Sequence, residues 1–297
     1  MSRKIVIGSR GSDLALWQAH YVEAELQKLG HEVEIKIIKT QGDKIQHLSF
    51  DKLEGKGFFT KELEEKLLSG DIDLAVHSHK DLPTEHPEGL IIAAVSERED
   101  PADILLIAKD KVDKSQPLHL MVKPVVGTSS ARRKSQLLLH RSDVDLKDLR
   151  GNVPTRINKL REGQYDAIML AAAGIIRLKL DLSEFYVLCL NPTEFIPAPA
   201  QGVLGLQIRE TDADLDEILQ NLNNPDIAKQ IGVERRILNL FEGGCQMPLG
   251  AYCVFENGEF KVKACVADSW DSEVRIAEKT GNEIEALAQE IVAALRG

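Results

Sequence analysis

Apolar and polar positions alternate with two different periods along the first two thirds of the chain. Short apolar or alternating runs at 4–8, 32–38 and 71–78 have the length and composition of β-strands, and helical patterns lie between them at about 12–29 and 60–69. The same order of runs returns at 103–108, 125–130, 165–170 and 185–190. Strands that alternate with helices are typical of α/β domains, so the pattern predicts two such units.

Two polar, proline-containing stretches separate these units. The first is EREDPAD at 97–103, and the second is IPAPAQG at 196–202, which precedes a further strand-like run at 203–208. If the chain passes between the two units once in each stretch, one domain is inserted into the other. After about 222 the pattern changes to a helix at 225–241, a hairpin and a last helix at 282–295. We therefore predict an α/β fold with a small α+β C-terminal domain, with domains at 1–98 plus 199–219, 99–198 and 220–297.

The predicted hairpin turns at Asn257-Gly258, the preferred two-residue sequence for such a turn. Pairing outward from the turn puts three pairs on one face, which are Phe255–Phe260, Cys253–Val262 and Ala251–Ala264. It puts two pairs on the other face, which are Glu256–Glu259 and Tyr252–Lys263. The first face is apolar, so it is predicted to belong to the core.

Composition and charge narrow the classes of function. The 297 residues are 43% hydrophobic, with a formal net charge of −10, which argues against a general nucleic-acid or anionic-membrane surface. No apolar run is long enough for a bilayer span or a signal-peptide core, and no nucleotide-binding glycine motif is present. Four cysteines without a C-x-x-C pair fit a reducing compartment. We expect a cytoplasmic protein with no membrane partner.

Among the cysteines, Cys245 stands out because it lies between glycines and a proline-stopped turn in FEGGCQMPLG. Flanking glycines remove side-chain cover and let another molecule approach closely. Cys245 is therefore predicted to be accessible to another molecule rather than buried in a core. Cys253 and Cys189 lie in apolar strand patterns and are predicted to be buried. The pattern leaves Cys265 undecided.

Several arginines lie at predicted helix starts, where a cation opposes the helix macrodipole. They are Arg10 beside the cap Ser12, Arg132 and Arg133 behind the cap Ser129 or Ser130, and Arg150 and Arg156 on either side of Pro154. Free amides and guanidinium groups together bind carboxylates or phosphates, so the set predicts an anionic ligand. The alternative is that they are solvated surface arginines.

The segment HSHKDLP at 77–83 leaves a predicted strand with polar side chains. Strict alternation would put His77, His79 and Asp81 on one face, so a metal site is one possibility, although no further ligand spacing supports it. The carboxylate of Asp81 is the better candidate, because it precedes Leu-Pro at a strand end and follows Lys80. An ordinary turn cap is the alternative for Asp81.

Taken together, these segments resemble the hydroxymethylbilane synthase family, also called porphobilinogen deaminases. The match spans most of the chain, in family order, through SRGSDLALWQA, GKGFFTKELE, HSHKDLP, EREDPAD, GTSSARRK, RGNVPTR, YDAIMLAAAG, PAPAQGVLGLQ and FEGGCQMPLG. The resemblance implies two domains like periplasmic binding proteins around a cleft, plus a third domain. It also implies a monomer that condenses four porphobilinogen molecules into hydroxymethylbilane and releases ammonia.

The resemblance further implies a dipyrromethane cofactor joined to Cys245 by a thioether, with Asp81 as the catalytic residue. It assigns cofactor binding to Lys80, Asp81, Thr128, Ser129, Arg132, Arg133, Arg150 and Gly151. It assigns substrate binding to Arg10, Ser12, Lys56, Arg150 and Arg156. No metal and no nucleic acid is implied. Replacing Arg132 or Arg156 is expected to impair product assembly while leaving stability nearly unchanged.

Three positions depart from the family pattern, which are His79 for methionine, Pro154 for glycine and Asp13 for proline or glutamine. None removes a reacting group. Two other classes of function remain open at this stage. A ligand-binding module would use the same arginines without chemistry, and an acyl-transfer enzyme would use Cys245 as its nucleophile.

Overall fold

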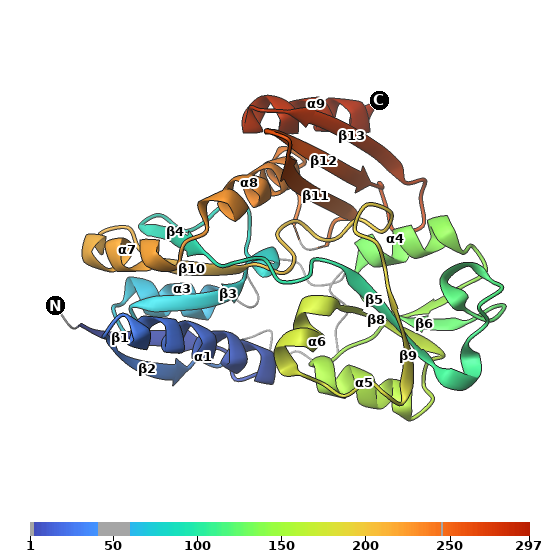
Figure 1. Ribbon diagram of the computed structural model, residues 1–297, viewed down its shortest axis with the longest axis horizontal. Helices are drawn as coiled ribbons and strands as arrows, with labels where there is room; N and C mark the ends of the chain where they lie inside the picture. Colours follow the sequence, from blue (N-terminus) through green and yellow to red (C-terminus); the bar gives the residue numbers. More distant parts are fainter. Residues whose placement is uncertain (1–2, 41–59, 245) are drawn as a thin grey trace. The chain divides into compact units, whose positions relative to one another are not determined.

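The computed structural model describes residues 3–40, 60–244 and 246–297 (Figure 1). They fall into two compact units, the first made of 3–40, 60–99 and 202–229, and the second of 100–201 and 230–297 without residue 245. Among the described residues, the chain passes between the units at 99–100 and 201–202, inside the two polar, proline-containing stretches, and again at 229–230. The second unit contains two separate sheets, and the division of the chain into three domains stays a prediction.

The first unit is built on a five-stranded sheet of order β2-β1-β3-β10-β4. The three parallel strands are β1 (Lys4–Ser9), β2 (Glu32–Ile37) and β3 (Leu74–Ser78). Between β3 and β4 (Leu90–Val95), and antiparallel to both, lies β10 (Leu204–Arg209). Apolar residues of α1 (Asp13–Lys28) and α7 (Ala213–Leu219) pack on one face, and those of α3 (Lys61–Leu68) pack on the other.

The second unit repeats this arrangement of strand directions, in the order β7-β6-β8-β5-β9. The parallel strands are β6 (Val125–Gly127), β7 (Asp145–Lys147) and β8 (Ala167–Ala171). The antiparallel strand β5 (Asp103–Ala108) lies between β8 and β9 (Phe185–Cys189). One face is covered by α4 (Ala131–His140) and the other by α5 (Val153–Arg161) and α6 (Ala172–Leu178).

The C-terminal part of the chain forms a three-stranded antiparallel sheet with two helices. Its strands are β11 (Leu249–Glu256), β12 (Glu259–Val266) and β13 (Arg275–Gly281), and its helices are α8 (Pro225–Leu240) and α9 (Ile284–Arg296). The β11–β12 register has all five predicted pairs. The α/β fold class with a small α+β C-terminal part is confirmed. Four short 3-10 turns complete the described elements, which are η2 (His79–Asp81), η3 (Lys109–Lys111), η4 (Pro117–His119) and η5 (Gln220–Leu222).

Burial of the cysteines follows the prediction in one case and contradicts it in another. Cys253 is fully buried in the C-terminal core, as predicted, and the undecided Cys265 is buried as well. Cys189, in contrast, is exposed. The reason is that β9 is an edge strand, so it has a partner on one side only and no second strand helps to cover its end. The predicted strand at 125–130 also ends early, at Gly127, because the following residues lead into α4.

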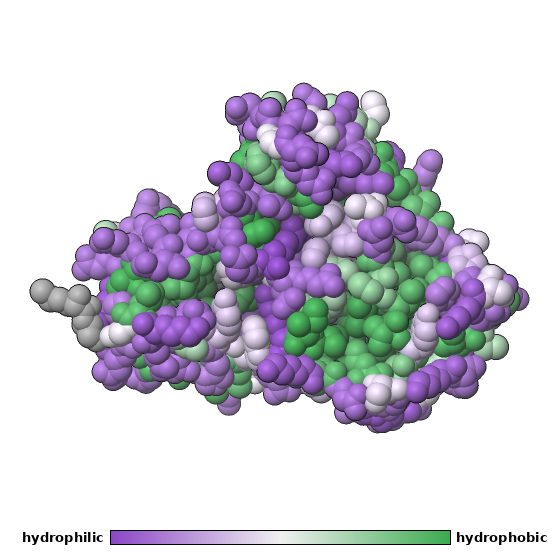
Figure 2. All heavy atoms as spheres, in the orientation of Figure 1, coloured by the Kyte–Doolittle hydropathy of each residue, from purple (hydrophilic) through white to green (hydrophobic). Residues whose placement is uncertain are grey.

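Among the described residues, no helix combines the length and the apolar character that crossing a bilayer requires. Figure 2 shows hydrophobic surface over α6 and β9, where Ile176 and Val187 are exposed. Exposed apolar side chains of this kind are common on protein surfaces, so they assign no function.

Gly202, at the second passage, is expected to tolerate no side chain. Its φ is +91°, and a Cβ there would lie 2.2 Å from the carbonyl oxygen of Glu99, whose own N–H donates to the Gly202 oxygen. Gly30 has a similar φ of +88° but open space around it, so Gly30→Ala is the matched control. We expect Gly202→Ala to lower the free energy of unfolding by about 2 kcal/mol more than Gly30→Ala, because it adds a steric clash to the same backbone strain. Urea unfolding of both variants measures this, and equal losses would contradict it.

Candidate active site

Asp81 lies just beyond the C-terminal end of β3, on the turn η2, and its side chain is exposed. The turn is fixed by backbone hydrogen bonds, because the N–H of His79 donates to Val203 O at 2.9 Å and the N–H of Leu82 donates to His79 O at 3.2 Å. Ligands of open α/β sheets bind at the carboxyl ends of strands. The sequence therefore places an accessible carboxylate where this class of fold binds ligands.

A metal site at 77–81 would need His77, His79 and Asp81 on one face of a continuous strand, and this prediction is wrong. β3 ends at Ser78 and the chain turns into η2, so His79 and Asp81 do not continue the face of His77. The imidazole of His77 is hydrogen-bonded to Gln207 at 3.0 Å, and burial lowers its pKa to about 4. Within the described ranges, no group of three or more His, Cys, Asp and Glu side chains could hold a metal ion.

At the start of α1, Ser12 is the N-cap, as predicted. Its hydroxyl oxygen accepts a hydrogen bond from the Ala15 N–H at 3.3 Å. The half-buried Arg10 follows β1 directly, so strand end, cation and helix start lie together. Half-buried Lys80, next to Asp81, belongs to the same unit.

At the start of α4, the two candidate serines have different tasks. Ser130 is the N-cap, because its hydroxyl accepts from the Arg133 N–H at 3.4 Å. The Ser129 hydroxyl instead donates to the carbonyl oxygen of Leu149 and accepts from the Leu149 N–H, both at 3.0 Å. Thr128 is buried, and its hydroxyl accepts from the Ser130 N–H. Ser129 thereby ties the start of α4 to the segment that precedes α5.

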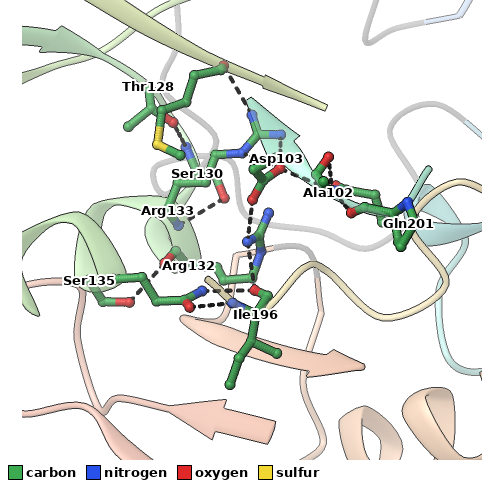
Figure 3. Close-up of polar contacts among 12 residues, drawn as sticks. Ala102, Asp103, Thr128, Ser130, Arg132, Arg133, Ser135, Ile196 and Gln201 are labelled. Carbon is green, nitrogen blue, oxygen red and sulfur yellow. Dashed lines mark hydrogen bonds and ion pairs between the residues drawn. The ribbon is translucent and has the colours of Figure 1, made fainter. Parts of the chain in front are cut away.

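Arg132 and Arg133 are buried and share one carboxylate, that of Asp103 at the start of β5 (Figure 3). Arg132 Nη1 lies 2.7 Å from Oδ2, and Arg133 Nη2 lies 2.7 Å from Oδ1. Gln201 Nε2 also donates to Oδ1, at 3.0 Å. Arg132 Nη1 donates in addition to the carbonyl oxygen of Ile196, at 2.8 Å.

This cluster changes the interpretation of the two arginines. Burial alone would raise the pKa of Asp103, but the charges and hydrogen bonds of Arg132 and Arg133 outweigh it and hold the pKa below its usual range. All three side-chain nitrogens of Arg133 donate within the protein, to Asp103 and to Met169 O. The solvated-surface alternative is therefore wrong for both. Their predicted role toward a cofactor stays a prediction.

At the start of α5, Asn152 is the N-cap and Pro154 lies in the first turn, so the departure from glycine is compatible with the helix. Gly151 has a φ of +112°, and its carbonyl oxygen accepts from Arg156 Nε at 2.8 Å. The carbonyl oxygen of the half-buried Arg150 accepts from Lys159 Nζ.

The predicted site residues thus form two groups. Those of the second unit lie around the starts of α4 and α5, which are Thr128, Ser129, Arg132, Arg133, Arg150, Gly151 and Arg156. Those of the first unit follow β1 and β3, which are Arg10, Ser12, Lys80 and Asp81. Cys245 and Lys56 lie outside the described residues.

Two charged residues of the second unit were missed by the sequence analysis. Asp103 opens an apolar strand, and its signal was a carboxylate as the first residue of the run DILLIA. Arg177 is buried in the otherwise apolar helix α6, and its signal was a single cation in AAAGIIRL. A charged residue inside an apolar run needs a partner when it is buried, so both positions could have been marked from the sequence.

Comparison with known proteins gives matches along nearly the whole chain. Residues 5–217 match the family model described as "Porphobilinogen deaminase, dipyromethane cofactor binding domain", and residues 228–296 match "Porphobilinogen deaminase, C-terminal domain". The porphobilinogen deaminase of Maridesulfovibrio salexigens is 44% identical over 300 residues, covering 98% of this chain and 96% of that relative. The one from Clostridium novyi is 43% identical over 288 residues, covering 95% and 94%.

Among solved structures, an ancestral cationic amino acid solute binding protein is similar with a TM-score of 0.44 and 16% identity, over 74% of this chain and 87% of that one. This similarity is too weak to support a conclusion. The family models and the two relatives, in contrast, agree with each other and with the motifs around Asp81 and Cys245. The chain therefore belongs to the porphobilinogen deaminase family.

Proposed function

We propose that this chain condenses four porphobilinogen molecules into hydroxymethylbilane, releasing one ammonia per unit, on a dipyrromethane primer attached to Cys245. The observation that carries the proposal is the match of both family models, the first of which is named for the dipyrromethane cofactor. The exposed carboxylate of Asp81 at a strand end supports the same activity.

The residues that would hold the cofactor fit its chemistry. Dipyrromethane carries acetate and propionate groups, and the starts of α4 and α5 offer Ser129, Arg132, Arg133, Arg150 and the Gly151 backbone near one another. Guanidinium groups and helix-start amides are the donors that carboxylates prefer. We assign Thr128, Lys80 and Asp81 to the same task. When bound, the cofactor supplies a primer to which pyrrole units are added.

The glycine before Cys245 also fits. A Cβ added at Gly244 would meet no described atom within 4 Å, its chain neighbours left aside. We infer that the missing side chain of Gly244 lets the pyrrole chain approach, which gives the G-G-C-Q sequence a physical reason.

Asp81 is proposed as the catalytic residue. When the aminomethyl C–N bond of porphobilinogen breaks and ammonia leaves, the remaining azafulvene is cationic, and a nearby carboxylate stabilises it. The methylene carbon then bonds to the α-carbon of the receiving pyrrole, which loses a proton that the carboxylate can accept. Substrate carboxylates are assigned to Arg10, Ser12, Lys56, Arg150 and Arg156.

We further propose that the chain acts as a monomer in the cytoplasm, with porphobilinogen as its partner and no nucleic acid. Attachment to Cys245 requires a reduced thiol, and among the described residues Cys189, Cys253 and Cys265 form no disulfide. Free thiols are typical of a reducing compartment.

The test is the intact mass of the denatured protein, measured beside Cys245→Ser. We expect the wild type to exceed its sequence mass by two linked porphobilinogen-derived pyrrole units, and the serine variant to show no excess, because its hydroxyl is a much weaker nucleophile than a thiol. Cys253→Ser serves as the control and should keep the excess. An unmodified wild type that also fails to gain mass after incubation with porphobilinogen would contradict the proposal.

A further inference from the structure

A continuous chain of hydrogen-bonded side chains crosses one face of the sheet in the first unit. Thr60 Oγ1 donates to Glu64 Oε2 at 3.4 Å, and Gln207 Nε2 donates to Glu64 Oε1 at 3.3 Å. The chain ends at His77, whose Nε2 lies 3.0 Å from Gln207 Oε1. All four side chains are buried, and His77 lies on β3, close in sequence to Asp81.

The hydrogen-bond directions in this polar chain are set from end to end. A carboxylate only accepts, so Gln207 turns its amide nitrogen to Glu64 and its oxygen to His77. The imidazole must then donate through Nε2–H. Burial keeps it neutral, since the pKa of His77 is lowered to about 4, with Arg10 and His86 adding smaller effects in the same direction. A single arrangement of donors and acceptors therefore fixes the ring of His77.

Buried apolar side chains make up much of the same interface between α3 and the sheet, where Arg209 Nη1 of β10 also donates to the carbonyl oxygen of Leu67 at 2.9 Å. Leu63, Leu67, Ile72 and Ala75 pack there as one buried cluster. Apolar side chains would fill the positions of Glu64, Gln207 and His77 without the desolvation that burial of polar groups costs. The polar chain runs from Gln207, which pairs with Ala75 of β3, to His77, one residue before β3 ends at Ser78, so it reaches the strand end that leads into η2.

The end of β3 is held from further directions as well. On the opposite side, Gln18 Nε2 of α1 donates to Ser78 Oγ at 2.8 Å. β10 has a glycine against the turn, and a Cβ on Gly205 would lie 3.0 Å from Leu82 Cδ1 and 3.2 Å from His79 Cδ2. The exposed carboxylate of Asp81 therefore stands on a turn whose base is fixed on several sides.

We propose that Glu64, Gln207 and His77 are positioning residues for Asp81, which hold the end of β3 so that the turn η2 presents the carboxylate in one place. This inference rests on the proposed function, in which Asp81 acts on the substrate. A displacement of about 1 Å in a reacting group can lower turnover by a factor of about a hundred. Loss of the polar chain is therefore expected to act on kcat rather than on substrate binding.

The test compares pairs of variants in the holoenzyme, with porphobilinogen as substrate. Glu64→Leu breaks the polar chain, whereas Glu64→Gln can still accept from Gln207. We expect Glu64→Leu to lower kcat by at least about tenfold with KM within about twofold, and Glu64→Gln to stay within about threefold of the wild type. His77→Leu and His77→Gln form a second pair with the same expectation, because a glutamine amide can donate where Nε2–H does. If Glu64→Leu does not fold, the two His77 variants test the inference in its place.

Leu67→Ala is the matched control, because it destabilises the same interface without touching the polar chain. We expect its kcat to remain at the wild-type level. Wild-type kcat in both leucine variants, or an equal fall in Leu67→Ala, would overturn the inference. Wild-type protein that does not convert porphobilinogen at all would instead overturn the proposed function and this inference with it, so the two failures are distinguishable.

Discussion

Asp81→Asn is expected to keep its fold and to lose turnover of porphobilinogen by a factor on the order of a thousand, the size of effect seen when one electrostatic group is removed from a transition state. The asparagine has the same shape but carries no negative charge, so it neither stabilises a cationic azafulvene nor accepts a proton. Stability should change little, because the side chain is exposed.

The measurement is kcat with porphobilinogen, together with the circular dichroism spectrum and the midpoint of thermal unfolding. Asp71→Asn is a matched control, since Asp71 is an exposed carboxylate near the other end of β3 and pairs with Lys66. Its kcat should equal that of the wild type. If Asp81→Asn kept more than a tenth of the wild-type kcat, Asp81 would not be the residue that carries the reaction.

Asp103→Asn is expected to destabilise the protein by about 3–5 kcal/mol, because it removes the carboxylate that Arg132 and Arg133 share and leaves two buried cations without this charged partner among the described residues. The value is large because the Asp103 side chain has no solvent exposure, so water cannot replace the lost contacts. Urea unfolding at neutral pH measures it. Asp145→Asn, at an exposed carboxylate in the same unit, should cost less than about 1 kcal/mol.

The interaction of Asp103 with Arg132 and Arg133 also predicts that the stability of the protein depends on pH. The pKa of Asp103 is lower in the folded protein than its usual value near 3.8, so the unfolded chain takes up a proton at a higher pH than the folded one. The contribution of Asp103 is therefore complete above pH about 4 and is lost as the pH falls toward the folded pKa. Asp103→Asn should lack this part of the acid destabilisation. A stability loss below about 1 kcal/mol, with an unchanged acid profile, would refute the role of the pair.

This result would also correct an expectation that the sequence alone supported. Replacing Arg132 was expected to leave stability nearly unchanged, because an arginine at a helix start looked like a ligand contact. The buried pair with Asp103 now makes a stability loss the expected outcome for Arg132→Leu. Arg156 differs, since its side chain is only half-buried and its Nε donates to a backbone oxygen five residues away.

Local structure was predictable because the residues that decide it are neighbours in sequence. The helix expected at about 12–29 spans Asp13–Lys28, with Ser12 as its cap, since a hydroxyl needs only the next turn to act. The hairpin register followed from Asn257-Gly258, because a two-residue turn fixes which residues face each other. The motifs along the chain, with those around Asp81 and Cys245 among them, were likewise enough to identify the family.

Burial was less predictable, because it depends on where a strand lies in its sheet. Cys189 has the same apolar neighbours as a core residue, yet β9 is an edge strand and leaves it exposed. Phe255 was placed on the core face and pairs with Phe260 as expected, but it lies near the tip of the hairpin and is 49% exposed. Alternation fixes the face of a residue, whereas neighbouring elements decide whether that face is covered.

The sequence by itself determined the α/β class, the Ser12 cap of α1, the hairpin register and the family. Only the tertiary structure decided which polar groups meet. Asp103 joins Arg132 and Arg133, and His77 joins Gln207 of a strand far along the chain. The physical reason is that caps and turns are set by interactions within a few residues. A buried charge or imidazole takes its partner from whichever strand the sheet topology places beside it, and that placement depends on the packing of the whole unit.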